Sequence, residues 1–381
     1  MEAIPRAYMT DLKRLLQDIF GGMVLGYEAL PALEAGQVER LPTLIVTREI
    51  NEHANVFHTL TDMLNVYITL LMLGWQDAPR QVLILDEHPP ASLDILWPLV
   101  AAGGGAEVLA QEGDPWHARQ GPRRLVRRAE ELPGPVVFQR AAFVPPGYTS
   151  LLFAHLYEEP SCRQATALFR GFREFMLAPF GLGAAAARMR DPGAPLAVRL
   201  VSRRPSKKWR RMARQIANEN ALLGMLRQVA TAAAASQHTE ASSAAGATGP
   251  LQSVEVSLLD LSELSLEEQL KVIAGTDILI GMHGAALAYS MLMAPHAAVV
   301  ELWPQQDGVW RCYENMSLWA GLLYRRLANT DPSKYQNTPT GDKTSVDVDS
   351  LQRIVEELLP AVQRRRRAGH AAAGALAGGA T

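Results

Sequence analysis

The passage from Thr276 to Leu287 has the composition of a turn that binds an anionic ligand. A buried-type apolar run, Asp277 to Ile280, leads into Gly281-Met282-His283-Gly284-Ala285-Ala286, and a helical pattern follows. Amides at a helix N-terminus bind phosphate because their N–H groups lack partners, and small side chains keep the approach open. We therefore predict that Gly281, Gly284, Ala285, Ala286 and Leu287 contact a phosphate-bearing ligand, with His283 hydrogen-bonding a diphosphate or sugar hydroxyl. On the local pattern alone, a packing turn with a structural histidine is the more common explanation.

Polar residues follow two other apolar runs in this part of the chain. Glu301 and Trp303 come after Ala298-Val299-Val300, where a carboxylate accepts hydrogen bonds from ribose or sugar hydroxyls and an indole offers a face to a base or sugar. Arg203 and Arg204 follow the run Leu196 to Val201, and a guanidinium fork supplies positive charge to a departing diphosphate without a metal. A strand-end cap, a core aromatic residue and a solvated basic loop are the competing interpretations.

A histidine and a carboxylate four residues apart indicate acid–base chemistry nearer the N-terminus. His58 and Asp62 lie on one face of the helix predicted for Asn55 to Leu73. Either group can remove the proton of an acceptor hydroxyl while the other orients it. A capping network at the helix N-terminus explains the same residues equally well.

Two further patterns resemble ligand motifs but have simpler explanations. Asp347-Val348-Asp349 has the Asp-x-Asp form of a metal site, yet it abuts the terminal helix and is better interpreted as its N-cap. Gly181 to Ala186 resembles a dinucleotide turn, but no strand precedes it, so a helix start is expected. We predict no metal site.

Alternating apolar runs and helical patterns must position these residues. Two short apolar runs predict buried parallel strands on either side of the helix expected for Asn55 to Leu73: Leu44 to Val46 and Val82 to Leu85. A third strand candidate is Val136 to Phe138. A helix from Ser161 to Leu177 follows. The runs 196–201, 254–258, 277–280 and 298–302 then alternate with helical patterns, which indicates a doubly wound α/β half.

Two stretches fall outside this alternation. Residues 230–250 are almost wholly Ala, Ser, Thr and Gly, too poor in large apolar groups to offset their ordering entropy, so we expect a flexible insertion. The terminal helix, Asp349 to Gln363, precedes Arg364 to Arg367 and an Ala/Gly tail. Four arginines suit a phosphate patch, but a solvated helix end before a disordered tail is the commoner arrangement.

Composition narrows the function classes. The chain has 381 residues, of which 48% are hydrophobic and 20% charged, and a formal net charge of −2. Such a length allows two lobes, and the balanced charge disfavours nucleic acid as a partner. Cys162 and Cys312 are the two cysteines, which excludes a disulfide framework but leaves one bridge open. Residues 1–18 contain Asp11, Lys13 and Arg14, so this segment lacks the apolar core of a signal peptide or membrane anchor.

These motifs resemble glycosyltransferase family 61. Asp277 to Leu287 is close to the family's strand followed by Gly-x-His-Gly-Ala-Gly-Leu, with Glu301 after the next strand. Ala286 replaces the usual second glycine, and its methyl narrows the backbone's approach to the donor. Asn55 to Asp62 looks like the family's Asn-x-Phe-His-x-x-x-Asp segment. Further agreement, at Phe143 to Phe153, Arg203-Arg204 and Glu267 to Ala274, extends the likeness over roughly residues 41–324.

The resemblance implies two Rossmann-like lobes of the GT-B type with a cleft between them. We expect an acceptor-side lobe at 1–160, a helical connection at 161–195, a nucleotide-sugar-binding lobe at 196–363 and a disordered tail at 364–381. It also implies a UDP-sugar co-substrate with no metal or other cofactor, inversion at the anomeric carbon, and the Golgi or endoplasmic-reticulum lumen. Members are usually type II membrane proteins, so a truncated or incomplete sequence is expected. The sequon Asn315-Met316-Ser317 is compatible with the lumen.

Three functions follow from the resemblance. The first is transfer of xylose from UDP-xylose to the core β-mannose of N-glycans, as in plant-type β-1,2-xylosyltransferases. The second is O-linked N-acetylglucosamine transfer to epidermal-growth-factor-like domains, whose enzymes share the Gly-rich loop and a segment like Arg311-Cys312-Tyr313. The third is a non-catalytic sugar-binding relative. A glycan or glycoprotein is the expected acceptor in the first two.

Overall fold

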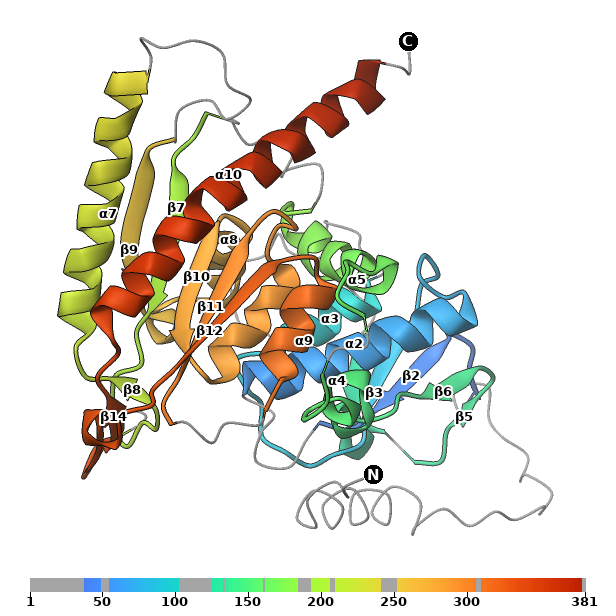
Figure 1. Cartoon of the computed structure of the whole chain (residues 1–381). Helices are drawn as coiled ribbons and strands as arrows, with labels where there is room; N and C mark the ends of the chain where they lie inside the picture. Colours follow the sequence, from blue (N-terminus) through green and yellow to red (C-terminus); the bar gives the residue numbers. More distant parts are fainter. Residues whose placement is uncertain are drawn as a thin grey trace. The chain divides into compact units, whose positions relative to one another are not determined.

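Two compact units, residues 1–154 and 155–381, make up the chain. The computed structural model describes residues 38–48, 55–102, 125–132, 134–159, 162–183, 193–205, 210–240, 252–305 and 310–378. Each unit contains its own parallel sheet (Figure 1). The α/β class predicted from the apolar runs is therefore confirmed. Residues 162–183, expected to connect two lobes, belong to the second unit.

Four parallel strands in the order β4-β3-β2-β6 form the main sheet of the first unit. Both central strands are short, fully buried apolar runs, which is the composition of parallel sheets covered on two faces. Val137–Phe138, within the predicted third strand, pairs with β1 instead, and β6 supplies the sheet edge. The strands are β1 Val38–Glu39, β2 Thr43–Val46, β3 Gln81–Ile84, β4 Val126–Arg128, β5 Val137–Phe138 and β6 Ala141–Phe143.

Helix α2, Val56–Leu73, links β2 to β3. It begins where the Asn55 side chain accepts a hydrogen bond from the Phe57 amide, and it ends at Gly74, whose φ of 66° suits the left-handed C-cap. Its length and hydropathy would permit a membrane span, but 56% of it is buried inside the protein, as in a core helix. The unit also contains α3 Leu96–Ala101, η3 Ala129–Glu131, η4 Gly147–Thr149 and α4 Leu151–Ala154.

Five parallel strands in the order β12-β11-β10-β7-β9 form the main sheet of the second unit. Successive side chains along a strand point to opposite faces, so alternate positions share a face. Leu200, Ile280 and Val300 belong to one core with α7 and α10, which lie side by side over that face (Figure 1). The strands are β7 Leu196–Val201, β9 Val254–Leu259, β10 Ile278–Met282, β11 Ala298–Trp303 and β12 Leu323–Ala328.

Gly281 and Glu301 point to the opposite face, where η7 and α9 lie. The helix expected after Ala285 is a 3-10 helix, η7, over Ala285–Leu292. A small sheet, β13-β14-β8, completes the unit. The remaining elements are α5 Ala167–Leu177, η5 Ala178–Phe180, β8 Gln215–Ile216, α7 Glu219–Glu240, η6 Leu261–Glu263, α8 Leu266–Ala274, α9 Cys312–Trp319, η8 Pro332–Lys334, β13 Tyr335–Thr338, β14 Gly341–Thr344 and α10 Val348–Gly378.

Two helices extend further than the sequence predicts. Residues 230–240, expected to start a flexible insertion, continue α7, because alanine favours helix; residues 241–250 lie outside the described ranges. Helix α10 runs past the predicted end through the arginine run to Gly378. Arg366 is 1% exposed and lies 3.5 Å from the buried Asp277 carboxylate, so this arginine does not belong to a solvated helix end.

Candidate active site

The carboxyl ends of β7, β10 and β11 bring together most of the residues predicted for the donor. Parallel pairing in register places the residues after these strands at one edge of the sheet, where ligands of open α/β sheets bind. A Cβ added to Gly284 would collide with the Nη1 atom of Arg203. The guanidinium of Arg203 thus lies directly against the glycine turn, and only glycine leaves it this room.

Glu301 is the buried centre of the site. It is 0% exposed, and its Cα pairs in register with those of Gly281 on β10 and Arg326 on β12. The Glu301 carboxylate accepts hydrogen bonds from His283 Nδ1 at 2.5 Å, from Arg326 Nε at 3.2 Å and from the Tyr324 hydroxyl. These contacts orient His283, and a direct contact of Glu301 with a ribose or sugar hydroxyl stays a prediction.

His283 is held in a fixed orientation by this carboxylate and by three aromatic rings. The imidazole is 3% exposed, and its centroid lies 4.0 Å from that of Trp303 and 5.0 Å from that of Tyr313. Burial lowers the pKa of His283; the hydrogen bond to Glu301 and the charge of this carboxylate oppose the shift only in part, and the positive charges of Arg214 and Arg326 add to it. A neutral imidazole that donates its Nδ1 proton to Glu301 leaves Nε2 as an acceptor.

Arg203 and Arg204, predicted as a pair, have different environments. Arg204 bonds to Glu219 through Nε at 3.0 Å and through Nη2, and its side chain is 56% exposed. Arg203 donates to the Ala213 carbonyl and the Met212 sulfur, and within the described ranges no carboxylate pairs with it. Burial, followed by the charge of Arg214, lowers the pKa of Arg203. Of the two arginines, Arg203 is therefore the one whose positive charge is available to bind an anion.

Arg214 is a site residue that sequence reasoning missed. Its positive charge lowers the pKa values of both Arg203 and His283. Its φ of 58° lies in the left-handed region, which residues other than glycine rarely adopt. The Arg214 amide is fixed by the Asp342 carboxylate at 2.9 Å. No sequence motif marks this residue, because a short loop brings it to the site.

The small residues of the turn have separate reasons to be small. A Cβ on Gly281 would lie 3.3 Å from both Leu287 Cδ2 and Val201 Cβ, so a larger residue at this position would press on its neighbours. Ala285 and Ala286 are partly exposed at the start of η7, where the first amides have no intrahelical acceptor. Leu287 is 0% exposed and belongs to the core, so its side chain is not available to a ligand.

The first unit places His58 and Asp62 at the carboxyl edge of its sheet. Both lie in the first turns of α2, which follows β2. Asp62 is 5% exposed, and its carboxylate accepts a hydrogen bond of 2.7 Å from the Gly147 backbone amide. The imidazole of His58 packs against Tyr148 and Phe153, with ring centroids 5.6 and 5.7 Å away. Asp62 thus fixes the loop that carries Tyr148, whereas His58 lies among aromatic rings.

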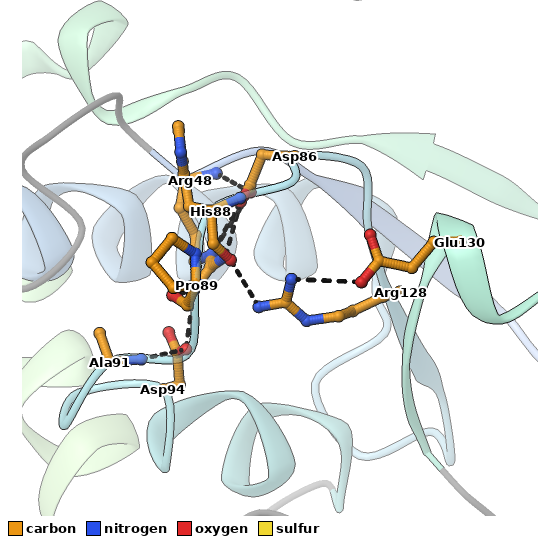
Figure 2. Close-up of polar contacts among 8 residues, drawn as sticks. All are labelled: Arg48, Asp86, His88, Pro89, Ala91, Asp94, Arg128 and Glu130. Atoms are coloured by element: carbon orange, nitrogen blue, oxygen red, sulfur yellow. Dashed lines mark hydrogen bonds and ion pairs between the residues drawn. The ribbon is translucent and has the colours of Figure 1, made fainter.

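A network of ion pairs at the same edge is a further feature that the sequence analysis missed (Figure 2). Arg48, after β2, is 2% exposed and pairs with Asp86 at 2.6 Å and Asp94 at 2.7 Å. The His88 carbonyl accepts hydrogen bonds from Arg48 at 2.5 Å and from Arg128 at 2.8 Å (Figure 2). These bonds fix the loop between β3 and α3. The sequence signal that could have indicated this network is the presence of charged residues, such as Arg48 and Asp86, just after apolar runs.

Three other sequence features can be placed. The Asp347 carboxylate accepts the Ser350 amide at 2.9 Å, which confirms the predicted helix cap. Cys162 and Cys312 are both free. Asn315 is 0% exposed and donates to the His155 carbonyl at 2.7 Å, so the sequon is inaccessible to glycosylation in the folded unit. Among the described residues, no group of three His, Cys, Asp or Glu side chains is arranged to hold a metal ion.

The fold and the carboxyl edge of the sheet in the second unit are those of a general class of protein. Parallel sheets that present a glycine turn, an unpaired arginine and free amides at their carboxyl edge are typical of α/β proteins that bind nucleotides. The sequence model of the family Glycosyltransferase 61 matches residues 43–300, more than half of the chain. The chain therefore belongs to glycosyltransferase family 61, as the motifs indicated.

Individual relatives are distant. A β-1,2-xylosyltransferase of Arabidopsis thaliana is 26% identical over 321 residues, covering 76% of this chain and 52% of the relative. A β-1,2-xylosyltransferase of Oryza sativa subsp. japonica is 26% identical over 285 residues, covering 71% and 46%. An EGF domain-specific O-linked N-acetylglucosamine transferase of Drosophila melanogaster is 25% identical over 312 residues, covering 79% and 48%. The chain spans about half the length of these relatives.

Proposed function

We propose that this chain is an inverting glycosyltransferase that uses a UDP-sugar donor, with xylose as the sugar and the core β-mannose of an N-glycan as the acceptor. The observation that carries the proposal is the guanidinium of Arg203, partly buried against Gly284 with no carboxylate partner in the described chain. A half-buried cation without a counter-ion is costly, and a bound anion compensates it. A diphosphate fits because Arg214 adds a second charge and η7 adds free amides.

The chemistry follows from this arrangement. As an acceptor hydroxyl oxygen attacks the anomeric carbon, the bond to the diphosphate breaks and negative charge grows on the β-phosphate. Arginines and amides fixed in advance stabilise that charge more in the transition state than in the ground state. His283, oriented by Glu301, accepts a hydrogen bond from a donor hydroxyl through Nε2. No divalent cation is needed in this scheme.

The base belongs to the first unit in this proposal. His58 is the better candidate, because the carboxylate of Asp62 is buried and already bonded to the Gly147 amide. Aromatic rings beside His58 suit the apolar face of a sugar. Asp62 is then a positioning residue, which holds the Gly147-Tyr148 loop against the imidazole. A two-lobe arrangement of the GT-B type would bring this base to the donor.

The named relatives leave two donor sugars to compare. Both plant relatives are xylosyltransferases and align with most of this chain, which favours xylose. The insect relative, an N-acetylglucosamine transferase, aligns over a similar length. A Golgi or endoplasmic-reticulum location stays a prediction of the family resemblance.

Turnover of UDP-xylose and of UDP-N-acetylglucosamine by the same preparation tests the proposal. Acceptors are an N-glycan that carries the core β-mannose and a folded EGF-like domain. Xylose transfer to the glycan is the expected result. Transfer of N-acetylglucosamine to the EGF-like domain would replace the proposed substrates with the second candidate, and binding of UDP without any transfer would make the chain a non-catalytic relative.

A further inference from the structure

A pocket of about 320 Å³ lies where β11 and β12 end in the second unit. Trp303 and Ala328 come from the two strand ends, Asp331 from the segment after β12, Thr344 from β14 and Asp347 from the start of α10. Pockets of this size hold small ligands, and more than half of the residues that line this one are polar. Neither His283 nor Arg203 lines it, so the pocket is distinct from the anion site described above.

Thr344 gives the pocket an unused hydrogen-bonding group. It is 1% exposed, and its hydroxyl has no partner among the described residues. By contrast, other polar groups of the pocket have partners. The Asp347 carboxylate accepts hydrogen bonds from the Ser350 backbone amide and from Lys334, and the Asn329 side-chain amide donates to the Pro304 carbonyl. Burying a hydroxyl without a partner is costly, and a ligand that bonds to it recovers that cost.

The charges of the pocket indicate which part of a ligand it accepts. Asp331 and Asp347 contribute carboxylates, and Lys334 is paired with Asp347 at 3.1 Å. Because the pocket carries no excess positive charge, it suits an uncharged group rather than a phosphate. Trp303 adds an aromatic wall; its ring also contacts the His283 imidazole, at 4.0 Å between centroids, and the Arg326 guanidinium, which lies 4.9 Å from the ring centroid.

The spacing of the strands relates the pocket to the anion site. Neighbouring strands lie about 4.8 Å apart, so the end of β12 is about 10 Å from the end of β10. A nucleotide whose diphosphate lies at Gly284 and Arg203 reaches across that distance with its ribose and base. Trp303, at the end of the intervening strand β11, borders both sites.

We propose that this pocket binds the uracil base and ribose of the donor, an inference that rests on the proposed function. The base lies against Trp303 and exchanges a hydrogen bond with the Thr344 hydroxyl. Ribose hydroxyls donate to the Asp331 carboxylate at the exposed rim. The same ligand therefore occupies two sites of opposite character, a neutral pocket at β11 and β12 and a cationic turn at β7 and β10.

Calorimetric titration of the whole chain with UDP, UMP and inorganic pyrophosphate separates the two sites. Thr344→Val removes a hydroxyl that has no partner in the free protein, so folding is preserved. We expect its Kd for UDP and for UMP to rise about tenfold, with pyrophosphate binding unchanged. Ala328→Leu fills the pocket and should abolish UMP binding while pyrophosphate still binds. Thr231→Val, at an exposed position of α7, is the matched control and should bind all three ligands normally.

The outcomes distinguish this inference from the proposed function. If Thr344→Val and Ala328→Leu bind UDP and UMP with the wild-type Kd while Arg203→Ala binds UDP weakly, the nucleoside lies elsewhere and the pocket assignment is wrong. If the wild-type chain binds neither UDP nor UMP, the donor assignment itself fails, and the pocket assignment fails with it.

Discussion

Replacement of Arg203 by alanine isolates the interaction on which donor binding depends. The Arg203 guanidinium lies against Gly284 and has no carboxylate partner in the described chain, whereas its neighbour Arg204 is paired with Glu219. A charge-assisted hydrogen bond contributes about 1.5–3 kcal/mol, so Arg203→Ala should raise the Kd for UDP by roughly 10-fold to 150-fold.

Arg204→Ala is the matched control, because the residue is adjacent and has the same charge. Its ion pair with Glu219 is largely solvent-exposed on the arginine side, and such pairs contribute about 0–1 kcal/mol to stability. We expect the Kd of this variant for UDP to stay within about twofold of wild type. Arg203→Lys keeps the charge but loses the planar fork, so its affinity should lie between those of wild type and Arg203→Ala.

Isothermal titration with UDP, at two salt concentrations, measures these effects directly. A thermal unfolding curve of each variant shows whether folding is retained, which is expected because the Arg203 side chain makes two weak polar contacts within the described residues. Equal Kd values for wild type and Arg203→Ala would refute the assignment of this arginine to the diphosphate. A larger loss in Arg204→Ala than in Arg203→Ala would show that the Glu219 pair opens to bind the ligand.

Three further predictions address the buried carboxylate, the imidazole and the proposal that sugar transfer needs no metal. Glu301→Gln leaves Arg326 without its counter-ion, so urea unfolding should show a loss of about 3 kcal/mol in the free energy of unfolding. The control Glu357→Gln, at an exposed ion pair, should lose under about 1 kcal/mol. Equal losses in the two variants would count against a central role for Glu301. Burial lowers the pKa of His283, so below pH 6.5, the ordinary pKa of histidine, the unfolded chain takes up a proton at this residue that the folded chain does not. The unfolding free energy should therefore fall more steeply from pH 6.5 to about 5 in wild type than in His283→Gln. Parallel curves for the two proteins would contradict this prediction. Sugar transfer should be unaffected by a chelator, and loss of activity that Mn²⁺ restores would place a metal in the reaction.

The sequence predicted the elements whose signals are local. Buried parallel strands appear as short apolar runs, and β7, β10 and β11 lie within one or two residues of the predicted bounds. Of the turn expected at Gly281 to Ala286, only His283 and Gly284 lie between the strand and the next helix, because Gly281 and Met282 belong to β10 and η7 begins at Ala285. Register then explains why residues after these strands meet at one edge, where His283 and Glu301 contact each other.

Features that depend on tertiary contacts escaped prediction. Charge alone places Arg366 in solvent, but its partner Asp277 lies 89 positions away and is buried. Arg214 and Arg48 carry no motif, because their roles come from a left-handed loop and from an ion-pair network. Arg203 and Arg204 are indistinguishable in sequence, and only Glu219 at the start of α7 separates them.

A crystal of this chain soaked with UDP is the most direct test of the account. We predict electron density for the diphosphate within hydrogen-bonding distance of the Arg203 guanidinium and the first amides of η7, beside Gly284. Density for the nucleotide away from this edge of the sheet, with Arg203 still against an unoccupied glycine turn, would contradict the account.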